Sequence, residues 1–566
     1  MSLPGAIDTK TSTGNSKDEQ YVLDYLNELK EESEDAKKKF CPVEDDKDAL
    51  KLYRGQYKPG DRNQYYSCDF VQMFIDRMVA GLTDNRPVLR VENRKQGLKK
   101  MASALEKSMT AVWQEEDMQR KSYRMCHNSA IRRSSGMYTG YDAINDCVSI
   151  EILTKDQVHF DPQINESSQI DQGEFVIVER IKPVDELVYR FPGRGALIKS
   201  EDVSFTSDKE RSGISIKSPV TDLLKSSPRK SVSRIIPRTY IYEAFLRDRQ
   251  CGADGEPYFP HGRRLIYTKD LVLWDGPVPY WDGQFPVDWF DWGVDPEHPW
   301  GISAPMMLKR LQLSFNEILD GTVANHILSN FLLITGASDV LDPAQWANLQ
   351  KITNSLILRK TSANKELTVT PPPSFGADKL NMAKALFTYA QLMTGVTDVT
   401  LGEHPGSLQS GQAIEGLQEG ASLMTRSRAS RLEDFYGRVG SKLMARILQF
   451  WPGDRVFHLL GPGGEAFEYI LNRKELFIND DGSPVSDKDR RDVFRHLRFA
   501  VLPGSSAPGT RQKRAEMMVK LMMLGCATRK MVLEAADFND VDRILLDVQE
   551  EFKTFPPPGF ERKKAN

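Results

Sequence analysis

The feature that most constrains this chain is an apolar stripe in its C-terminal half, long enough for an unusually long helix. Apolar residues recur three or four positions apart, with Arg428 as the single break: Ile414, Leu417, Ala421, Met424, Leu432, Phe435, Val439, Leu443 and Ile447. This spacing predicts an amphipathic helix over residues 411–450. About 40 residues at 1.5 Å each make a helix of about 60 Å. Such a helix needs a packing partner along its whole length.

Two shorter helical stripes precede the long one and enclose an insertion. The first predicts a helix over residues 304–329 with Ser303 as its N-cap candidate. The second predicts a helix over residues 379–394 that stops at Gly395. Residues 330–378 between them contain two short apolar runs that predict strands, Leu356–Leu358 and Leu367–Thr370. Residues 400–412 hold three Gly and one Pro, which predicts a loop.

The remaining segments alternate between helical and strand patterns, which predicts an α+β fold. Residues 1–16 are rich in Ser, Thr and Gly and are expected to be flexible, and residues 207–239 are expected to form an exposed loop. Helices are predicted over residues 17–50, from Phe70 to before Asn85, over 97–132, and near 508–523, 528–536 and 541–553. Strands are predicted at Val88–Val91, Glu174–Ile181, Tyr240–Phe245, Arg264–Tyr267 and Leu271–Trp274, and near 455–471 and 497–502.

Charge and cysteine content exclude several classes of protein. Lys and Arg number 76 against 79 Asp and Glu, a formal net charge of −3, so the chain lacks the basic excess of a protein that wraps DNA. The six cysteines lie far apart without a CxxC pair, which predicts reduced, buried thiols. The first 20 residues lack the pattern of a signal peptide, and the uncharged run Gly321–Ser338 is too polar to span a membrane. We therefore expect an intracellular product with no membrane partner.

No catalytic or metal-binding motif is complete. The segment Gly193–Ser200 approaches a phosphate-binding loop, but Ile198 occupies the position before Lys199 where Gly is required. The eight histidines are dispersed, and no HExxH or GxSxG is present, so packing or surface roles are expected for them. The acidic pairs Asp45–Asp46 and Asp480–Asp481 are expected in solvated turns. We expect no catalytic residues, no metal and no cofactor.

Five of the eight tryptophans crowd into one stretch: Trp274, Trp281, Trp289, Trp292 and Trp300. Such a cluster can stack sugars or bases, but it more often fills a core or a subunit interface, which we favour. The acids interspersed among them, Asp275, Asp282, Asp288, Asp291 and Asp295, would repel phosphate.

The order of these segments resembles the portal (head-to-tail connector) proteins of tailed bacteriophages. An aromatic strand block leads into Trp300-Gly301-Ile302-Ser303 and a helix carrying Leu311-Gln312 and Asn316; later, Ser410-Gly411-Gln412-Ala413-Ile414 opens the long helix. The likeness covers about residues 65–555. It implies a dodecameric ring at one capsid vertex, in the virion, that packages, retains and ejects double-stranded DNA without catalysis of its own. The implied partners are the terminase large subunit, the major capsid or scaffolding protein, and a tail adaptor.

The resemblance also implies a division of the chain. It assigns residues 17–302 and 411–505 to a mixed α/β wing with a long helix, residues 303–329 and 378–398 to two stem helices, and residues 330–377 to a small α/β clip. Residues 399–412 would form a tunnel loop, residues 506–555 a helical crown, and residues 556–566 a tail. We expect neighbouring copies in the ring to cover the apolar stripes of the long helix and the stem helices.

The resemblance suggests three groups of functional residues. The tunnel loop would meet DNA through Gly402, His404, Gly406, Leu408, Gln409 and Gly411. A subunit interface or the channel would use Arg426, Arg428, Arg431 and Arg438, and we favour pairing of these cations with acids of a neighbouring copy. The clip would dock terminase or adaptor through Trp346, Arg359 and Lys360. Two alternatives stay open, a nuclease or packaging ATPase and a carbohydrate-binding tail protein that uses the tryptophans.

Overall fold

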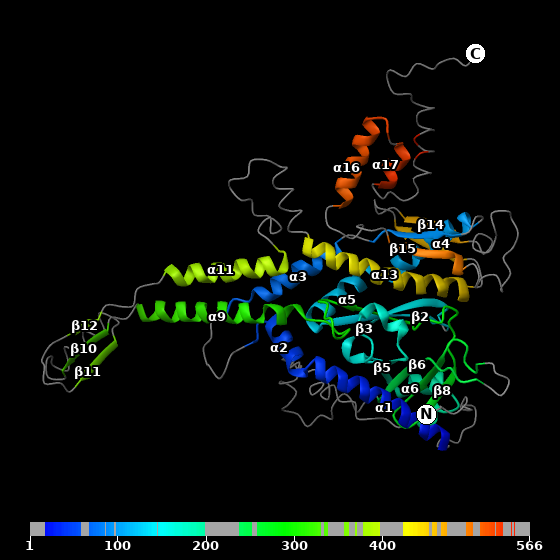
Figure 1. The fold of residues 1–566 in the computed structure, drawn as a ribbon, viewed down its shortest axis with the longest axis horizontal. Coiled ribbons are helices and arrows are strands. Elements are labelled where there is room, and N and C mark those ends of the chain that lie inside the picture. Colours follow the sequence, from blue (N-terminus) through cyan, green and yellow to red (C-terminus); the bar gives the residue numbers. More distant parts are fainter. Residues whose placement is uncertain are drawn as a thin grey trace, which may run out of the picture.

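The computed structural model describes most of the chain outside several connecting segments and the two ends. The described residues are 17–57, 67–84, 87–94, 98–143, 145–198, 237–251, 257–329, 333–337, 356–360, 368–370, 377–396, 423–451, 455–460, 466–471, 494–501, 510–526 and 528–535, with the single positions 545 and 548. They form an α+β body from which two long helices extend side by side to one side (Figure 1).

The N-terminal helices are more numerous than the apolar spacing predicts. The region 17–50 holds two helices, α1 (Lys17–Phe40) and α2 (Val43–Tyr53), because Pro42 adopts an extended conformation with ψ 134° between them. The helix predicted over 97–132 is also two, α4 (Lys99–Glu115) and α5 (Met118–Arg132), separated by Asp117 with φ 48°. The prediction of α3 (Phe70–Thr83) is confirmed.

Two antiparallel sheets form the centre of the body. The larger has the order β4 (Val158–Phe160), β5 (Phe175–Pro183), β6 (Arg238–Leu246), β7 (Arg263–Tyr267) and β8 (Val272–Pro277). The predicted strands near 174–181, 240–245, 264–267 and 271–274 are thus confirmed. The smaller sheet has the order β3 (Cys147–Thr154), β2 (Ser134–Asp142) and β9 (Val287–Asp291). Short helical turns lie at Lys155–Gln157, Ser167–Gln172, Val184–Arg190 (α6) and Gly195–Leu197.

The described part of the long helix is α13 (Leu423–Phe450), whose 28 residues make about 42 Å. Its apolar stripe belongs to the same core as α3, α4 and α5, with Leu432, Phe435, Val439, Leu443 and Ile447 fully buried. The expectation that neighbouring copies cover this stripe is therefore wrong for α13, because the chain covers it itself. The predicted start of the helix, residues 411–422, lies outside the described residues.

Small sheets and helices complete the body. β1 (Leu89–Asn93) pairs with β15 (Leu497–Val501), and β13 (Arg455–Leu460) pairs with β14 (Ala466–Leu471), both antiparallel. The phenyl ring of Phe499 on β15 packs directly against Gly440 of α13, so a Cβ at position 440 would overlap with it. At the C-terminal end, α16 (Thr510–Met523) and α17 (Arg529–Ala535) confirm two predicted helices, whereas the one predicted at 541–553 falls almost entirely outside the described residues.

The projection consists of α9 (Ala304–Ser329), α11 (Ala377–Thr394) and a three-stranded sheet at their far end (Figure 1). α9 has the predicted bounds, whereas α11 begins two residues before the predicted residue 379 and ends as predicted, at Gly395 with φ 74°. In the small sheet, β10 (Leu333–Ala337) lies between β11 (Leu356–Lys360), to which it is parallel, and β12 (Thr368–Thr370), to which it is antiparallel. The strands β11 and β12 were predicted; β10 was missed.

Candidate assembly site: the helical projection and its base

Aromatic side chains of α3, in the body, pack against both helices of the projection. The ring of Phe70 lies 5.4 Å from that of Phe315 on α9 and 5.9 Å from that of Phe387 on α11. Phe74, one turn further along α3, lies 5.4 Å from Phe387. These edge-to-face and tilted contacts bury large apolar rings at the point where the projection begins.

The outer side of α11 is apolar and exposed to solvent. Met382 is 59% exposed, Tyr389 57%, Leu392 62% and Met393 41%. Their spacing of seven, three and one residues places them on one side of the helix, whereas Ala390 and Thr394, on a different side, are buried. We call these four exposed residues the α11 stripe.

The α11 stripe ends at a small hollow between the projection and the body. Residues of four helices and of the segment after β9 line it: Met78, Trp292, Ala304, Met307, Leu308, Met393, Thr394 and Arg428. Met307 on its rim is 37% exposed. Most of its lining is apolar, so the hollow continues the apolar surface of the stripe.

Cations on one side of α13 are paired with acids of the same chain. The contacts in helix order are Arg431 with Asp291 (2.9 Å), Arg438 with Asp288 (3.7 Å), Lys442 with Asp288 (2.9 Å) and Asp171 (3.2 Å), and Arg446 with Asp282 (2.8 Å). We call the four cations the α13 ladder. Burial alone would lower the pKa of Lys442, but Asp288 and Asp171 outweigh it and raise that pKa.

The ladder changes the interpretation of the arginines predicted for a subunit interface or the channel. Arg431 and Arg438 already have acids and backbone carbonyls of their own chain as partners, rather than the acids of a neighbour that the sequence favoured. Arg428 lies with its guanidinium 5.2 Å from the ring centre of Trp292, and burial together with Arg431 lowers its pKa. Arg426 is exposed near the start of α13. The helical spacing of these cations was visible in the sequence, but their partners were not, because the partners lie elsewhere in the chain, within residues 171–292.

Most of the other predicted functional residues fall outside the described part of the chain. This holds for Trp346 of the predicted clip and for all six residues of the predicted tunnel loop, Gly402, His404, Gly406, Leu408, Gln409 and Gly411. Arg359 and Lys360 end β11, where their backbones pair with Gly336 and Ala337 of β10.

The aromatic stretch is part of the core, as favoured from sequence. Trp289, Trp292 and Trp300 are fully buried, and the ring of Trp300 stacks on Phe160 at 5.5 Å. A carbohydrate site built on these side chains would have no access to its ligand. The acids among them act within the fold, as the partners of the α13 ladder and as the pair of Asp275 with Arg263 at 2.6 Å.

Residues of the incomplete motifs described from the sequence also have structural roles. Arg194 within the phosphate-loop-like segment is buried and pairs with Glu19 at 2.8 Å. The expectation of a solvated turn at Asp45–Asp46 is wrong: both lie in the first turn of α2, where they pair with Arg133 at 3.1 and 3.2 Å. Cys41 and Cys126 are buried as the sequence predicts, whereas Cys68, Cys251 and Cys526 are exposed.

The sequence also predicts that Ser303 caps the start of α9. Ser303 does precede its first residue, Ala304. However, its buried hydroxyl makes no hydrogen bond to any described residue, so it is not a side-chain cap.

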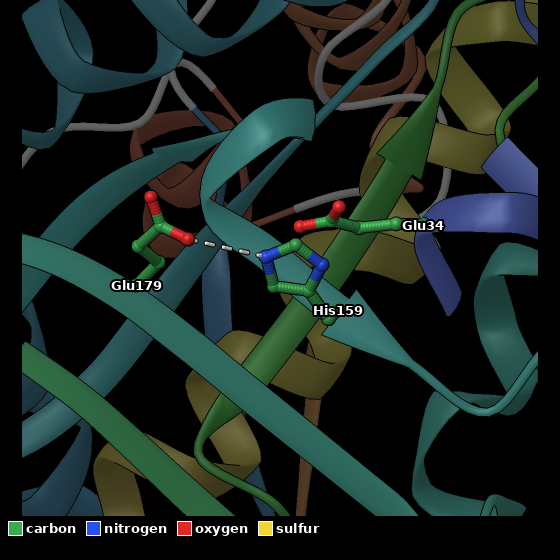
Figure 2. A group of neighbouring side chains, drawn as sticks. All are labelled: Glu34, His159 and Glu179. Atoms are coloured by element: carbon green, nitrogen blue, oxygen red, sulfur yellow. Dashed lines mark ion pairs between the residues drawn. The ribbon is translucent and has the colours of Figure 1, made fainter. Parts of the chain in front are cut away.

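One cluster brings together side chains of the types that bind metals. Glu34 of α1, His159 of β4 and Glu179 of β5 have ligand atoms within 4.8 Å of one another (Figure 2). Spacing within a single helix could not reveal it, because the three residues lie on three elements. Burial, aided by Lys37, lowers the pKa of His159 to about 3, so its ring is neutral.

Two lysines already balance the carboxylates of this cluster. The ammonium of Lys30 lies 3.1 Å from Glu179 and 3.7 Å from Glu34, and that of Lys37 lies 3.4 Å from Nδ1 of His159. A divalent cation would add uncompensated positive charge beside two ammonium groups. The cluster is therefore best explained as a buried ion network that holds α1 on the sheet.

Within the described residues, no helix is both long and apolar enough to cross a membrane.

Comparison with known proteins gives one clear match. No curated protein matches the chain. The family model described as phage P22-like portal protein matches residues 261–561, more than half of the chain, from β7 through the projection, α13, α16 and α17. The chain therefore belongs to the P22-like phage portal protein family.

Proposed function

We propose that this portal protein forms a closed ring at one vertex of the capsid, through which double-stranded DNA is packaged, retained and ejected. The family is one of structural proteins, and we assign no catalytic role. Twelve copies, the number that the resemblance implies, would have a mass of about 770 kDa if each is 64.2 kDa.

The α11 stripe is the observation that carries this proposal. Its four side chains are between 41% and 62% exposed, although the same helix buries other residues against α9. Apolar side chains gathered on one helix face mark an interaction surface. In a ring, every copy presents this face to the next by a head-to-tail contact, so that closure leaves no stripe exposed.

The family gives each part of the chain a proposed role. α9 and α11 are the stem helices, the sheet of β10, β11 and β12 belongs to the clip, and α16 and α17 belong to the crown. The clip docks the terminase large subunit and the tail adaptor, with Arg359 and Lys360 on its β11 strand. The body, as the wing, contacts the major capsid or scaffolding protein.

Passage of DNA requires a surface that does not hold phosphate tightly. The formal charge of −3 and the in-chain pairing of Arg431 and Arg438 suit such a conduit, because each strong phosphate contact would oppose sliding. Arg426 and Arg428 retain the proposed role at the interface or channel. Residues 399–412 are proposed as the loop that touches the duplex.

Mass measurement of a charge variant tests the ring. We expect Leu392→Glu to prevent assembly, so that light scattering detects subunits near 64 kDa while the wild type forms rings. Tyr189→Glu is the matched control, because Tyr189 is 80% exposed on α6, away from the projection. A Leu392→Glu protein that still forms full rings would contradict the role of the α11 stripe.

A further inference from the structure

Two buried amide side chains on α9 hold the backbone just before α3. Gln312 is 0% exposed and Asn316 is 2% exposed. Nε2 of Gln312 donates to the carbonyl oxygen of Cys68 at 2.9 Å, and its Oε1 accepts from the N–H of Phe70 at 3.1 Å. Oδ1 of Asn316 accepts from the N–H of Cys68 at 3.2 Å and from Nε2 of Gln312 at 2.8 Å. We call Gln312 and Asn316 the amide clamp.

The clamp satisfies groups that α3 leaves unsatisfied. Phe70 is the first residue of α3, so its N–H has no partner within that helix. Asp69, at the N-cap, makes no side-chain capping hydrogen bond. The capping function thus comes from a different helix, about 240 residues later in the chain, and the start of α3 is tied to α9.

Gln312 is suited to this position because it donates and accepts at once. Its amide supplies two donors and an acceptor, and the contacts with Cys68, Phe70 and Asn316 use all of these functions. A carboxylate of the same size only accepts, and a methionine of similar volume does neither to any useful extent.

The aromatic contacts alone do not fix the rotation and axial register of α9 relative to α3. The rings of Phe70, Phe315 and Phe387 are apolar, and apolar burial is largely non-directional. Hydrogen bonds lose strength steeply when their angle or length changes. A slide of α9 by one turn, about 5.4 Å, would bring Leu308 or Asn316 to the position of Gln312 and break the set.

We infer that the amide clamp is a positioning device that fixes the rotation and axial register of α9, and so the direction in which the projection leaves the body. The aromatic rings of α3 supply the apolar contacts between the projection and the body, and the amide clamp selects one orientation of α9. This role does not depend on the number of copies in the ring.

The test measures orientation and local protection separately from stability. Spin labels carried by non-natural residues at the exposed positions Ser103 of α4 and Lys384 of α11 report the distance between body and projection. The labelled chain is diluted into unlabelled protein, so that distances within one subunit are observed. We expect a narrow distribution in the wild type and a broadened or shifted one in Gln312→Met. Exchange of the Phe70 amide hydrogen should accelerate about tenfold or more in that variant.

Two further variants keep the test decisive. Asn316→Ala removes one acceptor and keeps Gln312, so a smaller change in the same direction is expected even if Gln312→Met folds poorly. Glu317→Gln, at an exposed position of the same helix, should match the wild type. A folded Gln312→Met or Asn316→Ala protein with the wild-type distance distribution overturns the inference, whatever its stability.

Discussion

Loss of Asp282 should destabilise the body strongly, because it leaves the guanidinium of Arg446 buried without a counter-charge. Arg446 is 0% exposed, its Nη1 lies 2.8 Å from Oδ2 of Asp282, and its guanidinium carbon lies 3.5 Å from the ring centre of Tyr280. Breaking a buried pair from one side typically costs about 3–5 kcal/mol, since the remaining charge stays desolvated. We expect a loss of that size in the free energy of unfolding of Asp282→Ala.

A double-mutant cycle separates this charge effect from lost packing. Arg446→Met alone strands the carboxylate of Asp282 and should cost a similar amount. The double variant buries neither charge, so its loss should fall short of the sum of the single losses by about 3 kcal/mol or more. Urea unfolding followed by tryptophan fluorescence provides the measurement, with Trp281 adjacent to the pair.

The partly exposed pair of Lys309 and Asp48 is the matched control. Its atoms are also 2.8 Å apart, but both side chains are 24% exposed. Asp48→Ala should therefore cost about 1 kcal/mol or less. Equal losses for Asp48→Ala and Asp282→Ala, or additive losses in the cycle, would falsify the reasoning from burial.

Three further predictions concern packing, pH and the proposed loop. Gly440→Ala should lower the free energy of unfolding by about 1–3 kcal/mol because its Cβ would meet the ring of Phe499, whereas Gly437→Ala on the same helix, with nothing within 4 Å, should be neutral or stabilising in the same urea assay. The pKa of His159 is about 3 in the folded protein against an ordinary 6.5, so its neutral ring stabilises the fold above pH 6.5, and this stability is lost as the pH falls towards 3. Between pH 6.5 and 4.5, the free energy of unfolding in urea should fall by about 2–3 kcal/mol more for the wild type than for His159→Asn. Shortening residues 400–412 should leave the ring mass unchanged and reduce the yield of DNA-filled particles; loss of the ring itself would contradict the loop assignment.

Local patterns in the sequence were sufficient to predict the helices of the projection and many of the helices and strands of the body. Apolar spacing gives the bounds of α9, and apolar spacing with Gly395 gives the end of α11, because the buried face of a helix is visible in the spacing of its own apolar residues. The break at Asp117 could not be predicted in this way, since the apolar spacing of residues 97–132 does not mark a position with φ 48°. β2 was missed because Ser, Gly and Thr fill five of its first seven positions, all buried, so its sequence shows neither polar alternation nor a continuous apolar run.

The candidate site shows the same division between local and non-local information. Gln312 and Asn316 were noticed as part of a recurrent pattern, but their hydrogen bonds to residues 68–70 required the fold. The cations of α13 were found from spacing, and the long helix was expected to need identical copies around it. The structure assigns that covering to the chain itself and leaves the exposed apolar surface on α11.

The α13 ladder has a mechanical consequence. Arg431, Lys442 and Arg446 pair with Asp291, Asp288 and Asp282, so the acids follow one another in the opposite direction along the chain. The ion pairs are therefore spread along the helix axis and are not gathered at one end. A pull along that axis loads them in shear, and they share the force, whereas a pull perpendicular to it would open them one after another. A force along α13 should therefore pass to residues 282–291 through these ion pairs together.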